Sequence, residues 1–372
     1  MVSMEELLNL MVQRGGSDLH ISVGSPPRIR VDGKLIDTEY ETLMPEATKK
    51  LIYSVLGADQ VAKFEKNLEL DFSFGVAGLG RFRTNAFIQR STVAAVLRVI
   101  PFEVFDFETI GLPSDVCESI CKLPRGLVLC TGSTGSGKST TLASMVNYIN
   151  EQRQGHIVTI EDPIEFLHRN KGCLINQREV GGDTHGFGKA LKSVLRQDPD
   201  VVLVGEMRDL ETIEAALTLA ETGHLTFATL HTSDVTQTIN RIVDVFPAHQ
   251  QQQIRTMMSF TLQAIVCQQL VPKQHGKGRA LAAEVMTATP AIRALIRDNK
   301  SHQIMSIIQT SAQAGMKTMN QSLFDLYRDG TISYEDAVAH TSDPTDFHRL
   351  MERAGMGGGV GAGMGGSGRR GR

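Results

Sequence analysis

The sequence has no apolar stretch long enough to span a membrane, and its first residues lack the basic segment that opens a signal peptide. The opening, MVSMEELLNLMVQRGG, instead predicts a capped helix. Ser3 stands at the N-cap, Glu6 completes a capping box, and a Gly-Gly pair stops the helix. We therefore expect a cytoplasmic protein.

Cysteine is scarce, and none of the five cysteines forms a C-x-x-C pair of the kind found in redox and zinc sites. An odd number argues against a complete disulfide framework, and several of them lie in apolar runs. They are Cys117, Cys121, Cys130, Cys173 and Cys267. We expect reduced, mostly buried thiols.

An excess of charge of one sign is also missing. Lys and Arg total 38 against 41 Asp and Glu, a formal net charge of −3, so the composition gives no whole-chain case for binding nucleic acid. The 372 residues are 41% hydrophobic and 21% charged, which predicts a soluble globular protein with two domains.

Alternating apolar and polar residues dominate the first hundred positions, with a hairpin signal at Asp32-Gly33. Strands are expected at 70–75, 80–90 and 93–100, and helices at 44–56 and 57–68. The pattern predicts a small α+β domain with an antiparallel sheet over 1–100. Residues 101–114 break the pattern and are expected to be a linker.

Continuous apolar runs replace this alternation in the second part of the chain. They lie within 126–132, 156–162, 201–206 and 225–232, each followed by a loop or helix. This arrangement predicts a parallel sheet with helices on both faces, so we expect an α/β domain over 115–354. Residues 245–350 are expected to be mostly helical, and the glycine-rich residues 355–372 to be a disordered tail.

A phosphate-binding loop is the most specific motif. The stretch GSTGSGKST fits G-x-x-x-x-G-K-[ST], and it follows a predicted strand and opens a predicted helix. Its residues are Gly132, Ser133, Thr134, Gly135, Ser136, Gly137, Lys138, Ser139 and Thr140. Backbone N–H groups would cradle the phosphates, Lys138 would neutralise their charge, and the Ser139 hydroxyl would bind Mg²⁺. The motif predicts a nucleoside triphosphate site.

Acidic residues follow two of the predicted strands. Glu206 ends the apolar run at 201–204, in a place suited to the Mg²⁺ shell or the attacking water, while Gly205 takes the usual aspartate position. Glu161, Asp162 and Glu165 follow another run. One of these three could be the general base for water; we favour Glu165, then Glu161. The alternative is that they are solvated turn acids.

Two histidines flank the predicted strand in GHLTFATLHT. His231 lies at its carboxyl end with Glu206, and His224 at the opposite end. An extended strand separates them by roughly 20 Å, too far to share a metal ion. With Thr229 and Thr232 nearby, His231 could report whether the γ-phosphate is present. For His224 a role in the site and a purely structural role both stay open.

These segments together resemble the secretion-type hexameric ATPases. GSTGSGKSTT, TIEDPIEF, VVLVGEMRD and GHLTFATLHTSD follow the order of their Walker A, Asp, Walker B and His boxes. PAIRALIRD resembles the C-terminal signature of the PilT-like motors that retract type IV pili, and SDLHISVGSPPRIRVDGKL their PAS-like N-terminal domain. The resemblance implies a RecA-like parallel-sheet P-loop ATPase domain behind a smaller PAS-like α+β domain.

The resemblance also implies partners. It predicts a homohexamer in which each N-terminal domain packs on the next subunit's ATPase domain, with ATP and Mg²⁺ between them. Arg81 and Arg83, which share one strand face, would then reach the γ-phosphate; a solvated strand edge is the alternative. Pilus-assembly and type II secretion relatives usually carry a longer N-terminal region and a tetracysteine zinc motif, which favours retraction here.

Arg293 and Arg297 form a like-charged pair four residues apart on the PAIRALIRD helix. The pair suggests an acidic partner, in the ring or on the inner-membrane platform protein, and a solvated helix face is the alternative. We expect a motor that depolymerises the pilin filament at the cytoplasmic face of the inner membrane and meets the membrane through its partners. Assembly, secretion or DNA-handling motors and an accessory nucleotide-dependent switch are the competing hypotheses.

Overall fold

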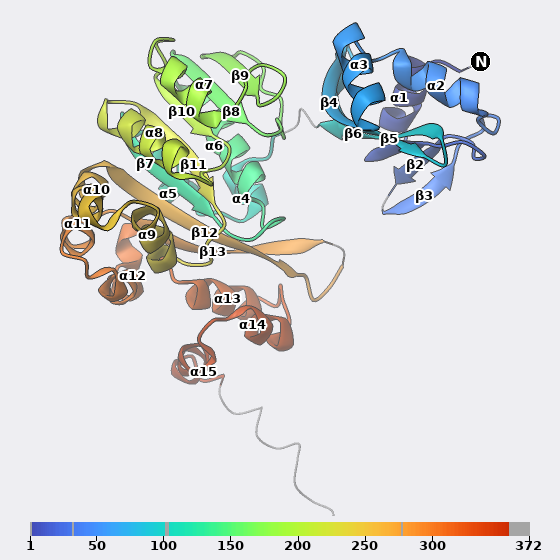
Figure 1. Ribbon diagram of the computed structural model, residues 1–372. Helices are drawn as coiled ribbons and strands as arrows, with labels where there is room; N and C mark the ends of the chain where they lie inside the picture. Colours follow the sequence, from blue (N-terminus) through green and yellow to red (C-terminus); the bar gives the residue numbers. More distant parts are fainter. Residues whose placement is uncertain (1, 32, 101–103, 277, 357–372) are drawn as a thin grey trace, which may run out of the picture. The chain divides into compact units, whose positions relative to one another are not determined.

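The computed structural model describes residues 2–31, 33–100, 104–276 and 278–356, and these divide into two compact units (Figure 1). The first unit holds the described residues up to 100, joined by Pro163–Arg169 and Gly181–Asp183. The second unit holds the described residues from Val104 onwards, apart from those two segments.

The first unit is built on a six-stranded antiparallel sheet in the order β3-β2-β1-β6-β5-β4. Its strands are β1 (Asp18–Ile21), β2 (Arg28–Val31), β3 (Lys34–Asp37), β4 (Glu69–Val76), β5 (Gly80–Gln89) and β6 (Thr92–Ile100). Its helices are α1 (Met4–Gln13), α2 (Pro45–Tyr53) and α3 (Ala58–Asn67). The α+β character expected from the alternating pattern is thus observed.

Local sequence explains these elements. The Ser3 hydroxyl accepts a hydrogen bond from the Glu6 N–H (3.2 Å), and the Glu6 carboxylate accepts one from the Ser3 N–H (2.7 Å), which is the capping box expected for α1. In β5, Phe82 and Ala86 are buried while Arg83 between them is exposed. The apolar face of the sheet packs with the helices into one hydrophobic core.

The second unit contains a seven-stranded sheet in the order β13-β12-β7-β11-β10-β8-β9, parallel except for the antiparallel pair β12–β13. Its strands are β7 (Gly126–Thr131), β8 (His156–Glu161), β9 (Leu174–Glu179), β10 (Val201–Val204), β11 (Leu225–Leu230), β12 (Leu262–Pro272) and β13 (Arg279–Thr287). The central strands β7, β10 and β11 are buried along their whole length.

Helices cover both faces of this sheet, as expected. They are α4 (Phe107–Ile110), α5 (Ser114–Cys121), α6 (Lys138–Gln152), α7 (Phe187–Val194), α8 (Leu210–Glu221), α9 (Val235–Asp244), α10 (Ala248–Thr261), α11 (Pro290–Arg297), α12 (Ile304–Thr310), α13 (Met319–Arg328), α14 (Tyr334–His340) and α15 (Pro344–Arg353). One hydrophobic core joins the sheet to α7–α12, and a second joins its other face to α4–α6. Helices α13–α15 enclose a smaller core against the β12–β13 hairpin.

The expectation that 245–350 is mostly helical was wrong for its centre, where β12 and β13 form a long hairpin. A buried strand and a buried helix both read as apolar runs, and periodicity alone does not separate them. Pairing with β7 decides the conformation of β12. Of the expected linker, 101–103 lie outside the described residues, and 104–114 carry α4, whose Phe107 is buried in the second unit.

Other expectations concern the cysteines, membrane spans and the tail. All five cysteines are buried free thiols, and burial raises the pKa of Cys117 to about 12. Across the described ranges, no helix is both long and apolar enough to cross a membrane. The predicted tail begins at Gly355, a positive-φ residue after α15, and its residues 357–372 lie outside the described part of the chain.

Helix α11 begins with Thr289 as N-cap and a proline at the first helical position. Arg293 is not a solvated surface cation. Its guanidinium donates to the carbonyls of Ala288 (3.1 Å), Ser259 (2.9 Å) and Phe260 (3.1 Å), and also to the Gln263 side chain (2.8 Å). Arg293 therefore satisfies carbonyls at the end of α10, which corrects the expectation that it faces an acidic partner. Arg297, the other arginine of this pair on α11, has a half-exposed side chain.

We predict that Arg293→Ala lowers the free energy of unfolding by about 2 kcal/mol, because carbonyls at the end of α10 lose their charged donor. Arg297→Ala, on the same helix, should change it by less than about 0.5 kcal/mol. The free energy of unfolding of both variants is measured by urea unfolding followed by circular dichroism. Equal destabilisation by the two substitutions would contradict this role of Arg293.

Candidate functional site

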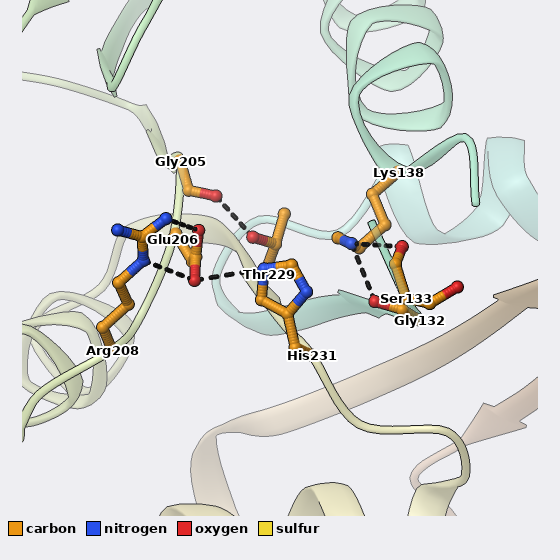
Figure 2. A network of polar contacts seen from close by, with 8 residues as sticks. All are labelled: Gly132, Ser133, Lys138, Gly205, Glu206, Arg208, Thr229 and His231. Atoms are coloured by element: carbon orange, nitrogen blue, oxygen red, sulfur yellow. Dashed lines mark hydrogen bonds and ion pairs between the residues drawn. The ribbon is translucent and has the colours of Figure 1, made fainter. Parts of the chain in front are cut away.

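The phosphate loop lies between the end of β7 and the start of α6 (Figure 2). Lys138 opens α6, and its ammonium donates hydrogen bonds to the carbonyls of Gly132 (2.8 Å) and Ser133 (2.9 Å). Partial burial lowers the pKa of Lys138. Ser139 follows on the first turn of α6 and is exposed. A lysine beside the unsatisfied N–H groups of a helix N-terminus suits the charge of a phosphate chain.

Gly132 is required by close packing against β12. Its φ is +141°, and a Cβ there would lie 2.4 Å from the Gln268 carbonyl oxygen and 2.6 Å from the Ser136 hydroxyl. The buried Gln268 side chain donates to Thr141 (2.8 Å) and accepts from the Cys130 thiol (2.6 Å). Sequence reasoning missed Gln268, for which the only signal is a polar residue within an apolar run.

Glu206 and His231 meet where β10 and β11 end (Figure 2). The Glu206 carboxylate accepts two hydrogen bonds from Arg208, at 2.6 and 2.8 Å, and lies 3.1 Å from the His231 Nε2. Partial burial raises the pKa of Glu206, but the Arg208 hydrogen bond and the charges of His231 and Arg208 outweigh it, so the pKa falls below its ordinary value. Arg208 was not singled out from the sequence; its spacing, two residues after Glu206, was the available signal.

The backbone of β8 explains the glycine before Glu206. A Cβ at Gly205 would lie 3.1 Å from both the Glu161 Cα and the Ile160 carbonyl oxygen, too close for an aspartate without movement of β8. The Gly205 carbonyl accepts a hydrogen bond from the Thr229 hydroxyl, and the Met207 N–H donates to the Thr229 carbonyl (3.0 Å). These contacts tie the end of β10 to the end of β11.

The acidic cluster is divided between the two units. Glu161 ends β8, where its carboxylate accepts hydrogen bonds from Thr159 (2.7 Å) and Gln177 (3.2 Å). Asp162 follows it in the second unit, at the same edge of the sheet as Lys138. Glu165 belongs to Pro163–Arg169, which groups with the first unit.

His224 is far from this edge. It precedes β11 at the opposite end of the strand, and its Nδ1 lies 3.0 Å from the Leu219 carbonyl and 3.2 Å from the Thr222 hydroxyl. Both partners are at the end of α8, so in this structure His224 contacts a helix terminus and not the phosphate loop.

Three arginines of the first unit share one face of its sheet. Arg81 and Arg83 alternate with the buried side chains of β5, and Arg83 is directly opposite Arg98 of β6. Arg98 donates to the buried Asp18 carboxylate (2.8 Å). Burial raises the pKa of Asp18, but the hydrogen bonds from Ser17 and Arg98 outweigh this effect, so the pKa falls below its usual value. Arg98 was not predicted, although it too lies in an alternating strand pattern.

This geometry defines a class of protein. A parallel sheet covered on both faces has a phosphate loop, a carboxylate–histidine pair and further carboxylates along one edge, as in P-loop nucleoside triphosphatases. The family model described as "Type II/IV secretion system protein" matches residues 3–339. The chain therefore belongs to the type II/IV secretion system protein family, and it is an ATPase of that family.

Curated relatives specify the branch. The chain is 51% identical over 342 residues to the type IV pilus retraction ATPase PilT of Pseudomonas aeruginosa, which covers 92% of this chain and 99% of that protein. It is 44% identical to the type IV pilus ATPase PilU of the same organism, covering 94% and 91%. A type II secretion system protein E of Xanthomonas campestris is 32% identical, covering 72% of this chain and 48% of that protein.

Solved structures agree with this assignment. A crystal structure of the pilus retraction motor PilT with bound ADP matches with a TM-score of 0.88 at 50% identity, covering 94% of this chain and 100% of that one. The ATPase DotB of Legionella pneumophila matches with a TM-score of 0.78 at 27% identity, covering 90% and 94%. The expected class, a PilT-like pilus retraction ATPase that binds nucleotide, is confirmed, and so is the fold class.

We predict that Gly132→Ala weakens ADP binding more than about tenfold, because the Gln268 carbonyl, a backbone atom of β12, has no room for the added methyl. Gly135→Ala is the matched control, since Gly135 also has a positive φ (+79°) but open space around it. Calorimetric titration with ADP measures both affinities. An equal loss of ADP affinity in the two variants would show that backbone strain, and not the contact with the Gln268 carbonyl, weakens binding.

Proposed function

We propose that the chain is a homohexameric motor that uses ATP hydrolysis to retract type IV pili. The observation that carries the proposal is the Glu206–His231 pair, which lies at the same sheet edge as the phosphate loop. An ionised carboxylate at that edge suits hydrolysis of the γ-phosphate. The histidine in contact with it could respond to whether the γ-phosphate is present. The match to the retraction ATPase PilT along nearly its whole length supports the same load.

ATP with Mg²⁺ is the substrate complex that this edge suits best. Lys138 would neutralise the β- and γ-phosphates, the exposed Ser139 hydroxyl would bind Mg²⁺, and Glu206 would complete its shell directly or through water. Within the described residues, no group of three or more His, Cys, Asp or Glu side chains could hold a metal ion alone. We therefore propose that Mg²⁺ enters the site bound to the phosphates of ATP. When bound, Mg²⁺ would offset the charge that develops on the phosphate oxygens.

The residues near the γ-phosphate would divide the remaining work. The lowered pKa of Glu206 keeps it ionised at neutral pH, so it can orient Mg²⁺ or the attacking water. The general base is one of the acidic-cluster carboxylates, and we favour Glu165, with Glu161 as the alternative. His231 would change its contact with Glu206 when the γ-phosphate is lost. In hydrolysis the water oxygen forms a bond to the γ-phosphorus while its proton passes to the general base, and the bond from that phosphorus to the β–γ bridging oxygen breaks, which gives ADP and phosphate.

Arginines from a neighbouring subunit would complete the site. Arg81 and Arg83 lie on the same sheet face as Arg98, which has the buried Asp18 carboxylate as its partner. The Arg83 side chain is exposed, so it is accessible to a triphosphate bound to the adjacent subunit. This accessibility supports a ring in which hydrolysis depends on assembly.

The proposed load is the pilin filament, and the proposed dock is the inner-membrane platform protein, reached from the cytoplasmic face of the membrane. Arg297, half exposed on α11, stays a candidate contact for an acidic partner, whereas Arg293 does not. DNA handling is not expected. An accessory role as a nucleotide switch is less well supported, because the chain has the phosphate-loop lysine, the carboxylates and His231 together.

We predict that subunits with complementary defects restore each other. Arg81→Ala/Arg83→Ala rings and Lys138→Ala rings should each lose phosphate release by about 10³-fold or more, because one lacks the arginines and the other the loop lysine. Mixed rings contain some interfaces with both intact halves and should regain measurable activity. Arg28→Ala, which removes an exposed β2 side chain that pairs with Asp37, is the control and should be fully active alone. Mixed rings that form but stay inactive would contradict action across subunits.

We also predict that Glu206→Gln preserves nucleotide binding but abolishes hydrolysis and pilus retraction. ADP affinity should stay within about twofold, phosphate release should fall by about 10²-fold or more, and cells carrying only this variant should not retract pili. Glu221→Gln, an exposed change on α8, is the control for expression and assembly. Retraction at a normal rate by the Glu206→Gln protein would refute the proposed function.

A further inference from the structure

A second carboxylate lies in the sheet behind the proposed site. Glu284 of β13 is only 2% exposed, and it is directly opposite Cys267 of β12, which in turn is opposite Thr131 of β7. Thr131 is the residue before the phosphate loop. Facing residues in adjacent strands have their side chains on the same side of a sheet, so Glu284 lies on the Thr131 side, where α9 packs.

Glu284 contacts the element that follows His231. The N–H of Val235, the first residue of α9, donates to its carboxylate at 2.9 Å. Residues 231–234, which run from His231 to the α9 N-cap Asp234, connect β11 to that N–H. The carboxylate thus satisfies one of the orphan donors of α9 and holds the far end of the segment that begins at His231.

The same carboxylate also faces α13, which packs along β13 (Figure 1). The N–H of Met319, the first residue of α13, faces it and helps to lower its pKa. On either side of Glu284, the Ala283 N–H donates to the Ser322 hydroxyl (3.0 Å), and Val285 exchanges two backbone hydrogen bonds with Lys317 (2.8 and 3.0 Å). Glu284 therefore lies between the N-terminus of α9, which donates to it, and the point where α13 is attached to the sheet.

We propose that Glu284 is a positioning residue for ATP hydrolysis, which holds the His231 segment in place and couples it to helix α13. A displacement of α13 would move the β13 segment to which it is attached, and with it Glu284, and through Val235 it would move His231 relative to Glu206. The proposal rests on the roles proposed above for Glu206 and His231. The proposal makes α13 one of the elements that transmit changes at the nucleotide site to the pilus machinery.

The ionisation of Glu284 gives this coupling a measurable signature. Burial and the nearby Asp234 raise its pKa to about 7, although the Val235 and Met319 N–H groups oppose the rise. Besides Asp234, Cys267 of β12 also faces it, and burial raises the pKa of that thiol well above its usual value. Glu284 is thus the group of this cluster that titrates near neutral pH.

The first test is Glu284→Gln in the full chain, assayed as phosphate release from Mg²⁺-ATP over pH 6 to 9. We expect kcat to fall about tenfold, which corresponds to about 1.4 kcal/mol of activation free energy, with KM within about twofold. A change in wild-type kcat near pH 7 should disappear, because the variant no longer titrates there. Asn320→Ala is the control: this buried α13 residue bonds Asp346 and the Asp343 carbonyl, away from Glu284.

A second pair of variants removes only the α13 donor. Met319→Pro lacks the N–H, and proline fits the first position of a helix, while Met319→Ala loses the same side chain and keeps the N–H. We expect Met319→Pro to have a lower kcat than Met319→Ala and a pH transition at higher pH, with equal thermal midpoints. Proline and alanine variants that share one pH profile would overturn the coupling to α13.

The outcomes separate the two proposals. Glu284→Gln and Asn320→Ala with the same kcat and pH dependence would give Glu284 a structural role alone and overturn the inference. Turnover that survives in Glu206→Gln would overturn the proposed function, whatever Glu284 does. A wild-type enzyme whose pH transition near 7 is lost only in the Glu284 variant supports positioning.

Discussion

The parallel pairing of β7, β11, β10 and β8 is the constraint on which the site depends. Because the strands run in one direction, the chain leaves each of them at the same edge, and the phosphate loop, Glu206, His231 and Glu161 follow one strand each. Burial on both faces stops any of these strands from sliding by one residue. A slip of that size would turn apolar side chains toward the wrong layer and would displace the residues at the end of the strand with them.

The hairpin of β12 and β13 adds two properties to this core. Through Gln268 it forms the wall against which the phosphate loop closes, so that position 132 has to be a glycine. Through Glu284 it carries a buried carboxylate that accepts from the N-terminus of α9, and the residues on either side of Glu284 bond to Ser322 of α13 and to Lys317 just before that helix. The hairpin thus connects the nucleotide edge to the C-terminal helices, which belong to the same compact unit. Mechanical work requires a connection of this kind.

The electrostatics of the two units are complementary in type. The second unit presents a lysine and the N–H groups of a helix N-terminus at one sheet edge, with the carboxylates of Glu206 and Glu161 along the same edge. The first unit presents arginines on one sheet face, of which Arg98 has a buried partner in Asp18. Like charges are costly to gather on one face, and the Asp18 carboxylate offsets part of that cost. The role proposed for Arg81 and Arg83 across subunits would confine hydrolysis to the assembled ring.

The sequence by itself determined the parallel sheet and the phosphate loop, and it placed Glu206 and His231 at the end of their strands. Those features are written in local pattern: unbroken apolar runs, a glycine-rich turn and short spacings. It did not determine the β12–β13 hairpin, because a buried strand and a buried helix have the same composition. Nor did it reveal the contacts of Arg293, Gln268 or Glu284, whose partners lie 30 or more positions away in several cases. Whether a charged side chain faces solvent or a buried helix end depends on which segments fold against it, and only the tertiary structure decided that.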